Sequence, residues 1–151
     1  MKALIQRVLR GNVSVGNKIV GKISRGYVVL LGVRTGDTEK NALYLAHKTV
    51  SLRVFPDNNQ RMNLSIQDIN GEILVIPQFT LYADTKKGCR PSFINAAPPE
   101  IAEVLYNTYV NALRRAIGNH HVATGTFRET MTVEIINNGP VTIEIISEGE
   151  V

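Results

Sequence analysis

The sequence predicts a mixed α/β (α+β) fold in which two helices pack on a strand-rich sheet. Apolar residues alternate, or run without a break, in several segments of strand length. Two other segments carry apolar residues at helical spacing, and no linker, internal repeat or low-complexity stretch separates them. With 44% hydrophobic and 20% charged residues, the 151-residue chain has the size and composition of a single domain spanning residues 1–151.

The first third of the chain is expected to form three strands and one helix. Residues 2–15 alternate in part, and the turn signal at 16–17 leads into a second strand at 19–23. Residues 27–33 are apolar throughout, which is typical of a strand buried on both faces. Thr38 is a suitable N-cap for the helix. The apolar positions of that helix are Ala42, Leu43, Ala46 and Val50.

The middle of the chain continues with extended segments. Residues 52–55 are expected to be extended and to stop at the turn signal of residues 56–59. Residues 72–76 predict another buried strand, which delivers residues 78–80 to its C-terminal end. A polar, basic loop is expected over residues 83–98.

The last third predicts a helix followed by a hairpin. The two prolines at 98–99 suit a first helical turn, and Gly118 suits its end. The predicted buried stripe consists of Ile101, Leu105, Tyr109, Ala112 and Ala116. Alternating segments at 131–135 and 141–145 are expected to pair around a turn at residues 137–140.

Composition excludes several classes of protein. The net charge of +4 permits a polyanionic partner without requiring one. No apolar run reaches the roughly 18 residues of a membrane span, and the first residues lack the apolar stretch of a secretory signal, so we expect a cytoplasmic protein with no membrane partner. Cys89 is the one cysteine, and the histidines at 47, 120 and 121 lack metal-ligand spacing. We therefore expect no metal and no cofactor.

The first candidate site follows the strand predicted at 72–76. The sequence contains no GxxxxGK[ST], GxGxxG or GxSxG motif. Pro77 removes a ladder donor, so strand pairing is expected to end there. Backbone N–H groups freed at such a break can point at a ligand oxygen, as an oxyanion hole requires, while Gln78 and Thr80 add an amide and a hydroxyl. Taken alone, this segment is more typical of an ordinary strand end.

The second candidate site is the segment Asn138-Gly139-Pro140. Asn-Gly favours a tight turn, but a proline directly after the glycine is unusual because it has no N–H for a ladder. X-Pro bonds are the only peptide bonds that adopt cis at low cost. A cis Gly139–Pro140 bond would expose two carbonyl oxygens that could accept hydrogen bonds from an ammonium group. Taken alone, this pattern favours a simple turn.

Together, the two segments resemble the signature motifs of D-aminoacyl-tRNA deacylases. The similarity extends over nearly the whole chain, with both motifs at the expected separation and the flanking strands in order. The stretches that carry it are residues 2–8, 30–33, 52–55, 61–65, 71–75, 78–84 and 90–93, Met131, and residues 138–142.

The resemblance implies a homodimeric hydrolase with composite active sites. Its substrate would be the ester bond of D-aminoacyl-tRNA, and also of glycyl-mischarged tRNA. Gly139 and Pro140 would form a cis dipeptide that enters the partner's site, engages the α-amino group and excludes L-amino acids. Arg7 would hold this dipeptide, and Met131 would contribute to substrate binding.

The resemblance also assigns a catalytic segment and a surface for tRNA. Backbone N–H groups around Phe79 and Thr80 would stabilise the developing oxyanion, Gln78 would line the pocket, and the terminal 2′-hydroxyl of the RNA would assist cleavage. A threonine hydroxyl needs an adjacent base to attack well, and the local sequence offers none. We therefore assign Thr80 a positioning role. The residues expected to contact tRNA phosphates are Lys86, Lys87 and Arg90, with Arg114 and Arg115 as an extension of that surface.

Three positions depart from the family pattern. Pro77 stands where serine is usual, Asn138 stands where aspartate is common, and residues 127–130 are bulkier and more charged than the usual small residues. Two alternatives stay open. One is a non-catalytic, nucleic-acid-binding dimer of the same fold. The other is a related deacylase that removes an L-amino acid such as alanine, for which a trans Gly139–Pro140 bond is expected.

Overall fold

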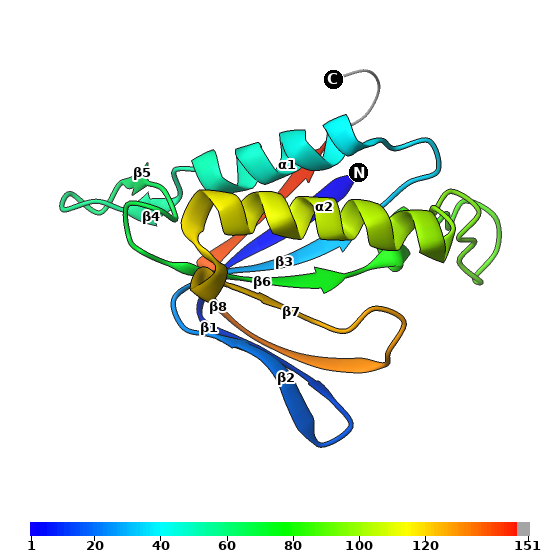
Figure 1. The fold of residues 1–151 in the computed structure, drawn as a ribbon, viewed down its shortest axis with the longest axis horizontal. Helices are drawn as coiled ribbons and strands as arrows, with labels where there is room; N and C mark the ends of the chain where they lie inside the picture. Colours follow the sequence, from blue (N-terminus) through cyan, green and yellow to red (C-terminus); the bar gives the residue numbers. More distant parts are fainter. Residues whose placement is uncertain (148–151) are drawn as a thin grey trace.

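A six-stranded sheet and two helices dominate the computed structural model, which describes residues 1–147 (Figure 1). The sheet contains β1 (Lys2–Val15), β2 (Lys18–Ile23), β3 (Gly26–Gly32), β6 (Glu72–Pro77), β7 (Val122–Thr124) and β8 (Met131–Ile146). The helices are α1 (Glu39–Ser51) and α2 (Pro99–Ile117). Smaller elements are the pair β4 (Phe55–Pro56) and β5 (Met62–Leu64) and the 3-10 helices η1 (Phe79–Tyr82) and η2 (Asn119–His121). The predicted mixed fold of strands and two packed helices is confirmed.

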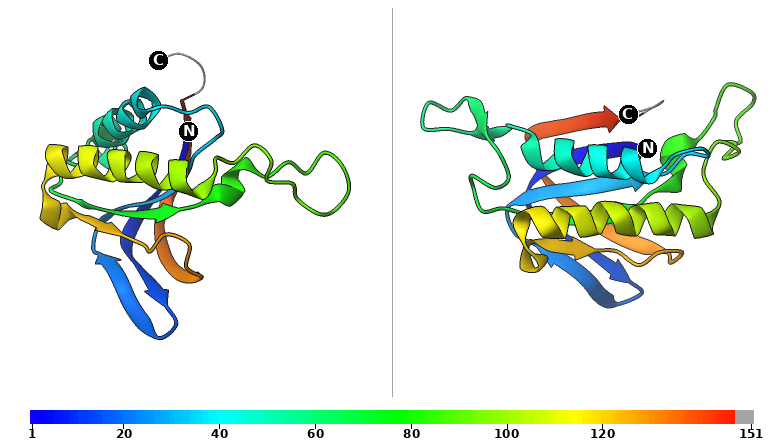
Figure 2. Two further views of the ribbon diagram at one scale, coloured as in Figure 1. Left: turned by 45° about the vertical axis from the view of Figure 1, so that its right-hand side comes forward. Right: turned by 45° about the horizontal axis from the view of Figure 1, so that its top comes forward.

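The sheet combines antiparallel and parallel pairing. Strand β1 pairs antiparallel with β2, β3 and β8, whereas β3, β6 and β7 run parallel to one another. Parallel neighbours need long crossover connections, and each crossover here contains one of the two long helices. Both helices cover the same face of the sheet and lie side by side, as Figures 1 and 2 show.

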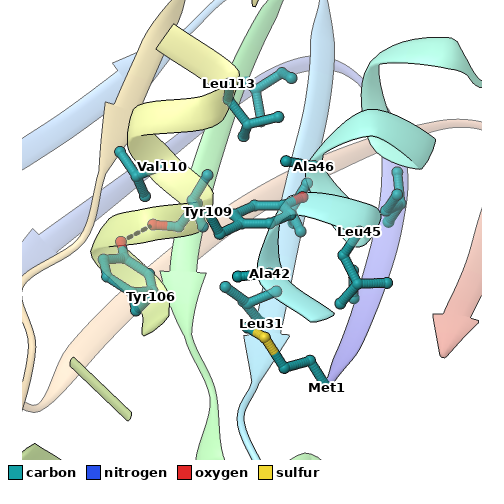
Figure 3. Packing of buried hydrophobic residues seen from close by; sticks show 14 of the residues in the cluster. Met1, Leu31, Ala42, Leu45, Ala46, Tyr106, Tyr109, Val110 and Leu113 are labelled. Atoms are coloured by element: carbon teal, nitrogen blue, oxygen red, sulfur yellow. Dashed lines mark hydrogen bonds between the residues drawn. The ribbon is translucent and has the colours of Figure 1, made fainter. Parts of the chain in front are cut away.

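The larger hydrophobic core lies between this sheet face and the two helices. Figure 3 shows how Tyr109 and Leu113 of α2 meet Leu45 and Ala46 of α1 over the sheet. The Tyr109 hydroxyl lies 2.7 Å from the Thr49 hydroxyl, so this buried hydroxyl has a hydrogen-bond partner. Burial of the phenol raises the pKa of Tyr109 well above its ordinary value, which keeps the group neutral.

A second, smaller core lies on the opposite face of the sheet. Strands β1 and β8 both bend, so that their distal halves fold with β2 beneath β3 and β6 (Figure 1). The buried side chains of this second core are Val8, Val13, Ile23, Val28, Leu74 and Ile76. Strands β3 and β6 are therefore covered on both faces, which agrees with the unbroken apolar runs in their sequences.

The predicted helices are present, but their buried faces differ from the predicted stripes. Thr38 caps α1 in a capping box with Asn41. Leu43 is 39% exposed, Ile101 is 52% exposed and Ala116 is exposed as well, so all three are wrong as core positions. Each helix packs against the other helix as well as against the sheet. Its buried face is therefore shifted toward the other helix. The buried residues of α2 are Ala102, Leu105, Tyr106, Tyr109, Val110 and Leu113.

The terminal hairpin predicted around residues 137–140 is wrong. Residues Met131–Ile146 form one strand, β8, which pairs with β1 along both of its halves. Because β1 is 14 residues long, it offers ladder partners to both alternating segments, which therefore need no pairing with each other. Gln6 pairs with Thr142 and Val8 pairs with Asn137, so residues 138–141 bulge out opposite Arg7. We call residues 138–141 the β8 bulge.

Strands β5 and β7 were not predicted. Each has three residues, which is too short for an alternating pattern to emerge. Within the part of the chain that the structure describes, neither helix combines the length and the apolar character that a membrane crossing requires.

Candidate active site

A pocket of about 730 Å³ opens beside the C-terminal end of β6. Four segments form its walls: the end of β6, the loop before α2, the first turn of α2, and the connection from β7 into β8. The lining residues are Ile76, Pro77, Gln78, Phe79, Phe93, Ala96, Ala97, Pro98, Pro99, Ala102, Phe127, Arg128, Glu129, Thr130, Met131 and Val133. The predicted site residues Gln78, Phe79 and Met131 are therefore brought together.

Strand pairing ends at the edge of this pocket, next to Pro77. Pro77 is the last residue of β6 and pairs with Leu31 of β3, whose carbonyl accepts a 2.8 Å hydrogen bond from the Gln78 N–H. The chain then turns into η1. The first N–H groups of a helix have no partner inside it, and residues 1–147 supply no other acceptor for those of Phe79 and Thr80. Two backbone donors are thus available at the start of η1, in the segment where Gln78 and Phe79 line the pocket.

Thr80 is not among the residues that line the pocket. Its hydroxyl accepts a hydrogen bond from the side-chain amide of Gln78. No carboxylate or histidine contacts this hydroxyl among the described residues, so no general base is available to activate it there. The contact orients both side chains at the start of η1.

The remaining walls were mostly missed by sequence reasoning. Phe79 is 58% exposed and meets Phe93 edge-on, with ring centroids 5.0 Å apart. The Met131 sulfur lies 3.4 Å from the Thr126 N–H, which donates to it. Phe93 had a signal because it falls in one of the stretches that carry the resemblance, and residues 127–130 had one because they depart from the family pattern. From the sequence, the prolines at the start of α2 indicated only where that helix begins.

The unusual segment at residues 127–130 lies on the pocket wall. The Arg128 guanidinium donates a 2.8 Å hydrogen bond to the Glu100 carboxylate in the first turn of α2. The backbone N–H of Glu100 and the Arg128 guanidinium hold the pKa of that carboxyl below its usual value. This exposed ion pair ties the β7–β8 connection to α2 beside the pocket.

The β8 bulge is held by two side chains. The Arg7 Nε donates to the Asn138 carbonyl at 2.9 Å, and its Nη1 donates to the Val54 carbonyl at 2.5 Å. At the base of the bulge, the Asn137 side-chain carbonyl accepts from the Val141 N–H at 2.8 Å. The Gly139–Pro140 bond is cis, as the resemblance implies and unlike the trans bond expected for an L-specific deacylase.

Arg7 lies next to a buried tyrosine. Tyr27 pairs with Arg7 across the ladder, is fully buried, and stacks at an angle on Phe55 with ring centroids 5.0 Å apart. Burial raises the pKa of Tyr27, and the nearby Arg7 charge opposes that rise. The phenol therefore stays neutral beside the guanidinium and forms no ion pair with it. The guanidinium donates instead to the Asn138 and Val54 carbonyls.

One chain does not bring its two motifs together. Arg7 pairs with Tyr27 at one end of β3, whereas Pro77 pairs with Leu31 four positions along that strand. This separation corresponds to about 13 Å along the strand. In Figure 1 the bend of β8 lies at the left and the end of β6 at the right. Accordingly, neither Gly139 nor Pro140 lines the pocket.

The basic loop predicted after the first motif projects from the molecule between η1 and α2 (Figure 2), and its residues Phe93, Ala96 and Ala97 line the pocket. Its side chains Lys86, Lys87 and Arg90 are exposed. Arg114 and Arg115 lie in the last turn of α2, whereas the loop joins its first turn, so their expected contact with tRNA stays a prediction for a separate part of the surface. A 19-residue helix separates its ends by roughly 28 Å.

Among residues 1–147, no three histidine, cysteine, aspartate or glutamate side chains gather closely enough to hold a metal ion. The candidate site instead offers backbone N–H donors, an aromatic and apolar wall, and one ion pair at its rim. Such an arrangement suits electrostatic stabilisation of an oxyanion in a partly dehydrated pocket.

Comparison with known proteins identifies similar chains. A family model described as D-Tyr-tRNA(Tyr) deacylase matches residues 4–146. A D-aminoacyl-tRNA deacylase from Desulforamulus reducens is 52% identical over 143 residues, which cover 95% of each chain. The solved structure of a c-Myc DNA Unwinding Element Binding Protein is 41% identical, with a TM-score of 0.93 over 99% of this chain and 100% of that chain. A probable eukaryotic D-amino acid tRNA deacylase shares the fold, with a TM-score of 0.78 at 18% identity over 95% and 98% of the two chains.

Proposed function

Because the chain belongs to the D-Tyr-tRNA(Tyr) deacylase family, we propose that it hydrolyses the ester bond of D-aminoacyl-tRNA to free amino acid and tRNA. The observation that carries this proposal is the pair of N–H groups of Phe79 and Thr80, which have no acceptor among residues 1–147 and lie in the segment where Gln78 and Phe79 line the pocket. We expect the enzyme to act in the cytoplasm, where its substrate is made.

The proposed reaction needs little chemistry from side chains. Water adds to the acyl carbon of the ester, the bond from that carbon to the ribose oxygen breaks, and the ribose oxygen takes up a proton. The N–H groups of Phe79 and Thr80 stabilise the oxyanion that develops on the acyl oxygen. The neighbouring 2′-hydroxyl of the terminal adenosine assists the proton transfer. Thr80 acts by orienting Gln78 and η1, since no base contacts its hydroxyl.

Chiral selection is proposed to come from a second subunit. Within one chain the β8 bulge and the pocket lie at opposite ends of β3, so the bulge can reach a pocket only on another copy. A homodimer with twofold symmetry forms two such composite sites at once. The Gly139 and Pro140 carbonyls would then accept hydrogen bonds from the substrate α-ammonium. Their backbone would leave space for D-amino acids and glycine but not for an L side chain.

The direct test follows the release of the amino acid. Purified protein is incubated with D-tyrosyl-tRNA, glycyl-tRNA charged on a non-cognate tRNA, and L-tyrosyl-tRNA. Release of D-tyrosine and glycine, with L-tyrosyl-tRNA left intact, is the expected result. Equal hydrolysis of both tyrosyl esters would contradict the proposed selection.

The shared site is tested with mixed dimers. One variant carries Gly139→Ala in the bulge, and the other carries Ala96→Trp, which fills the pocket. If each site combines two subunits, co-expression restores activity, because a mixed dimer has one site with an intact bulge and an intact pocket. If each site lies within one chain, the mixture stays as inactive as either variant alone.

A second candidate function is a non-catalytic, nucleic-acid-binding dimer. The observation that favours it is the 41% identity to a solved protein that is named for binding a DNA unwinding element. The two functions differ in turnover. Tight binding of tRNA or DNA without release of D-tyrosine would favour the second candidate over the deacylase.

A further inference from the structure

The connection from β7 into β8, residues 125–130, runs alongside the end of β6. Gly125 donates a 3.0 Å hydrogen bond to the Val75 carbonyl, and Val75 pairs with Thr124, the last residue of β7. Neighbouring strands lie about 4.8 Å apart, so the connection leaves the sheet next to the segment that leads into η1. Its residues 127–130 line the pocket. This pocket wall therefore starts beside the strand that leads to the backbone donors of η1.

Both ends of this connection are fixed by packing. A Cβ added to Gly125 would lie 2.7 Å from the Met131 sulfur and 3.3 Å from Ile76 Cδ1, so the backbone there is packed closely against two residues of the pocket. Phe127 packs against the larger core and meets the Tyr106 ring, with centroids 5.9 Å apart. Met131 begins β8 and pairs with β1. The part of the connection that can change its position is therefore the stretch between Phe127 and Met131.

We call this stretch, the exposed residues 128–130, the tip of the connection. Among residues 1–147, the one hydrogen bond that joins the tip to another element runs from the Arg128 guanidinium to the Glu100 carboxylate, at 2.8 Å. A second bond is local and long, from the Glu129 N–H to the Thr126 carbonyl at 3.4 Å. Arg128 has a φ of +65°, a left-handed conformation that persists only where surrounding contacts hold it. The ion pair therefore holds the tip toward α2.

The ion pair is too exposed to add much to the stability of the fold. The Arg128 side chain is 56% exposed and that of Glu100 is 75% exposed, and ion pairs of this kind contribute little to the free energy of unfolding. Arg128 lines the pocket, whereas Glu100 does not. The first turn of α2, which carries Glu100, contributes Pro99 and Ala102 to the opposite wall. The pair therefore fixes the spacing of two pocket walls.

We propose that the Arg128–Glu100 ion pair limits the size of the amino-acid side chain that the pocket accepts, with Glu100 as a positioning residue that acts through Arg128. This inference rests on the proposed function, which puts the acyl carbon at the N–H groups of Phe79 and Thr80. The α-carbon is bonded to that acyl carbon, so its side chain lies beside the connection from β7 into β8. A tip held toward α2 favours compact D-aminoacyl and glycyl esters, and a released tip gives room to larger side chains such as that of D-tyrosine.

The test compares D-tyrosyl and D-alanyl esters on the same tRNA, so that contacts with the RNA are equal. Glu100→Lys places a like charge beside Arg128 and should release the tip. We expect the ratio of KM for the D-tyrosyl ester to KM for the D-alanyl ester to fall about threefold, with kcat unchanged for both. Combining Glu100→Lys with Arg128→Glu reverses the pair and should restore the wild-type ratio. Glu134→Lys is the matched control, because it makes the same change of charge at the exposed ion pair with Arg10.

Salt dependence gives a second readout. Salt screens the attraction in the wild-type protein and the repulsion in Glu100→Lys, so the two KM ratios should converge as the salt concentration rises. A ratio that is the same in the wild type and Glu100→Lys at low salt, or a charge-reversed double variant that keeps the ratio of Glu100→Lys, would overturn the proposal.

Binding without turnover separates this inference from the proposed function. The probes are amides that join D-tyrosine or D-alanine to 3′-amino-3′-deoxyadenosine, which the protein cannot hydrolyse as esters. The ratio of their dissociation constants should shift in Glu100→Lys as the KM ratio does. That shift without hydrolysis of either ester would support the inference and contradict the proposed function alone. Failure of the protein to bind either amide would overturn the inference.

Discussion

The end of β6 and the β8 bulge are built in opposite ways. The first depends on the main chain, because a buried parallel strand stops at Pro77 and leaves backbone donors at the start of η1, next to a pocket formed within one chain. The second is an interruption of a strand, exposed at Gly139 and Pro140, and its shape depends on the side chains of Arg7 and Asn137. The framework of the pocket is therefore provided by one chain, whereas Gly139 and Pro140 of the bulge do not line that pocket.

This difference predicts where the protein is sensitive to substitution. Side chains at the start of η1 should matter modestly, because the proposed chemistry uses backbone N–H groups. Residues that hold the bulge should matter strongly, because a misplacement of about 1 Å at a catalytic site can cost on the order of 100-fold in rate.

The largest effect is expected from Gly139→Ala. Gly139 has a φ of +134°, and an added Cβ would meet Val141 Cγ2 at 2.8 Å and Arg7 Nη2 at 2.9 Å. We expect deacylation of D-tyrosyl-tRNA to fall by about 100-fold or more while the fold persists. The measurements are kcat/KM and thermal melting by circular dichroism.

Gly16→Ala is the matched control for that variant. Gly16 also has a positive φ, +57°, but an added Cβ would meet nothing within 4 Å. Activity should therefore be retained in this variant. A folded Gly139→Ala protein with near-normal activity would show that clearance at the bulge is not limiting.

Arg7→Lys is expected to have the next largest effect. The guanidinium donates to two carbonyl groups at once, those of Asn138 and Val54, and a lysine ammonium cannot reproduce this planar geometry. Activity should fall by roughly tenfold to 100-fold, and discrimination between D- and L-tyrosyl-tRNA should weaken. Thermal melting is the accompanying check, and an unchanged D-to-L ratio would mean that Arg7 serves stability alone.

Asn137 provides a finer test at the base of the bulge. Asn137→Ala leaves the Val141 N–H without its acceptor and should reduce kcat/KM by about tenfold. Asn137→Asp keeps an acceptor oxygen and should lose less, because Thr142 can then donate to the carboxylate. Equal activities for the two variants would indicate that this hydrogen bond does not shape the bulge.

The smallest effect is expected from Thr80→Ala. The Thr80 hydroxyl contacts Gln78 and lies off the pocket wall, so its loss should change kcat by only a few-fold. Single-turnover rates with D-tyrosyl-tRNA measure this step directly. Complete loss of activity in a folded Thr80→Ala protein would assign the hydroxyl a chemical role and remove the contrast between the two regions.

The sequence by itself determined most local elements. Periodicity gave the buried strands β3 and β6, the cap of α1 and the end of α2, because each depends on residues within a few positions. It also delivered Gln78 and Phe79 to the end of β6, next to the pocket that the structure reveals. The roles assigned to Arg7, Gly139 and Pro140 came from resemblance, and they stay predictions until the dimer is tested.

The tertiary structure alone decided the partners of these elements. Local alternation cannot tell a hairpin from one strand laid along a long neighbour, so β8 became visible only once β1 offered it a ladder on both sides of Arg7. The exact face of each helix depended on the other helix, and the pocket joined the end of β6, the first turn of α2 and the connection from β7 into β8. Such contacts arise from packing between residues far apart in the chain, and no local pattern of residues specifies them.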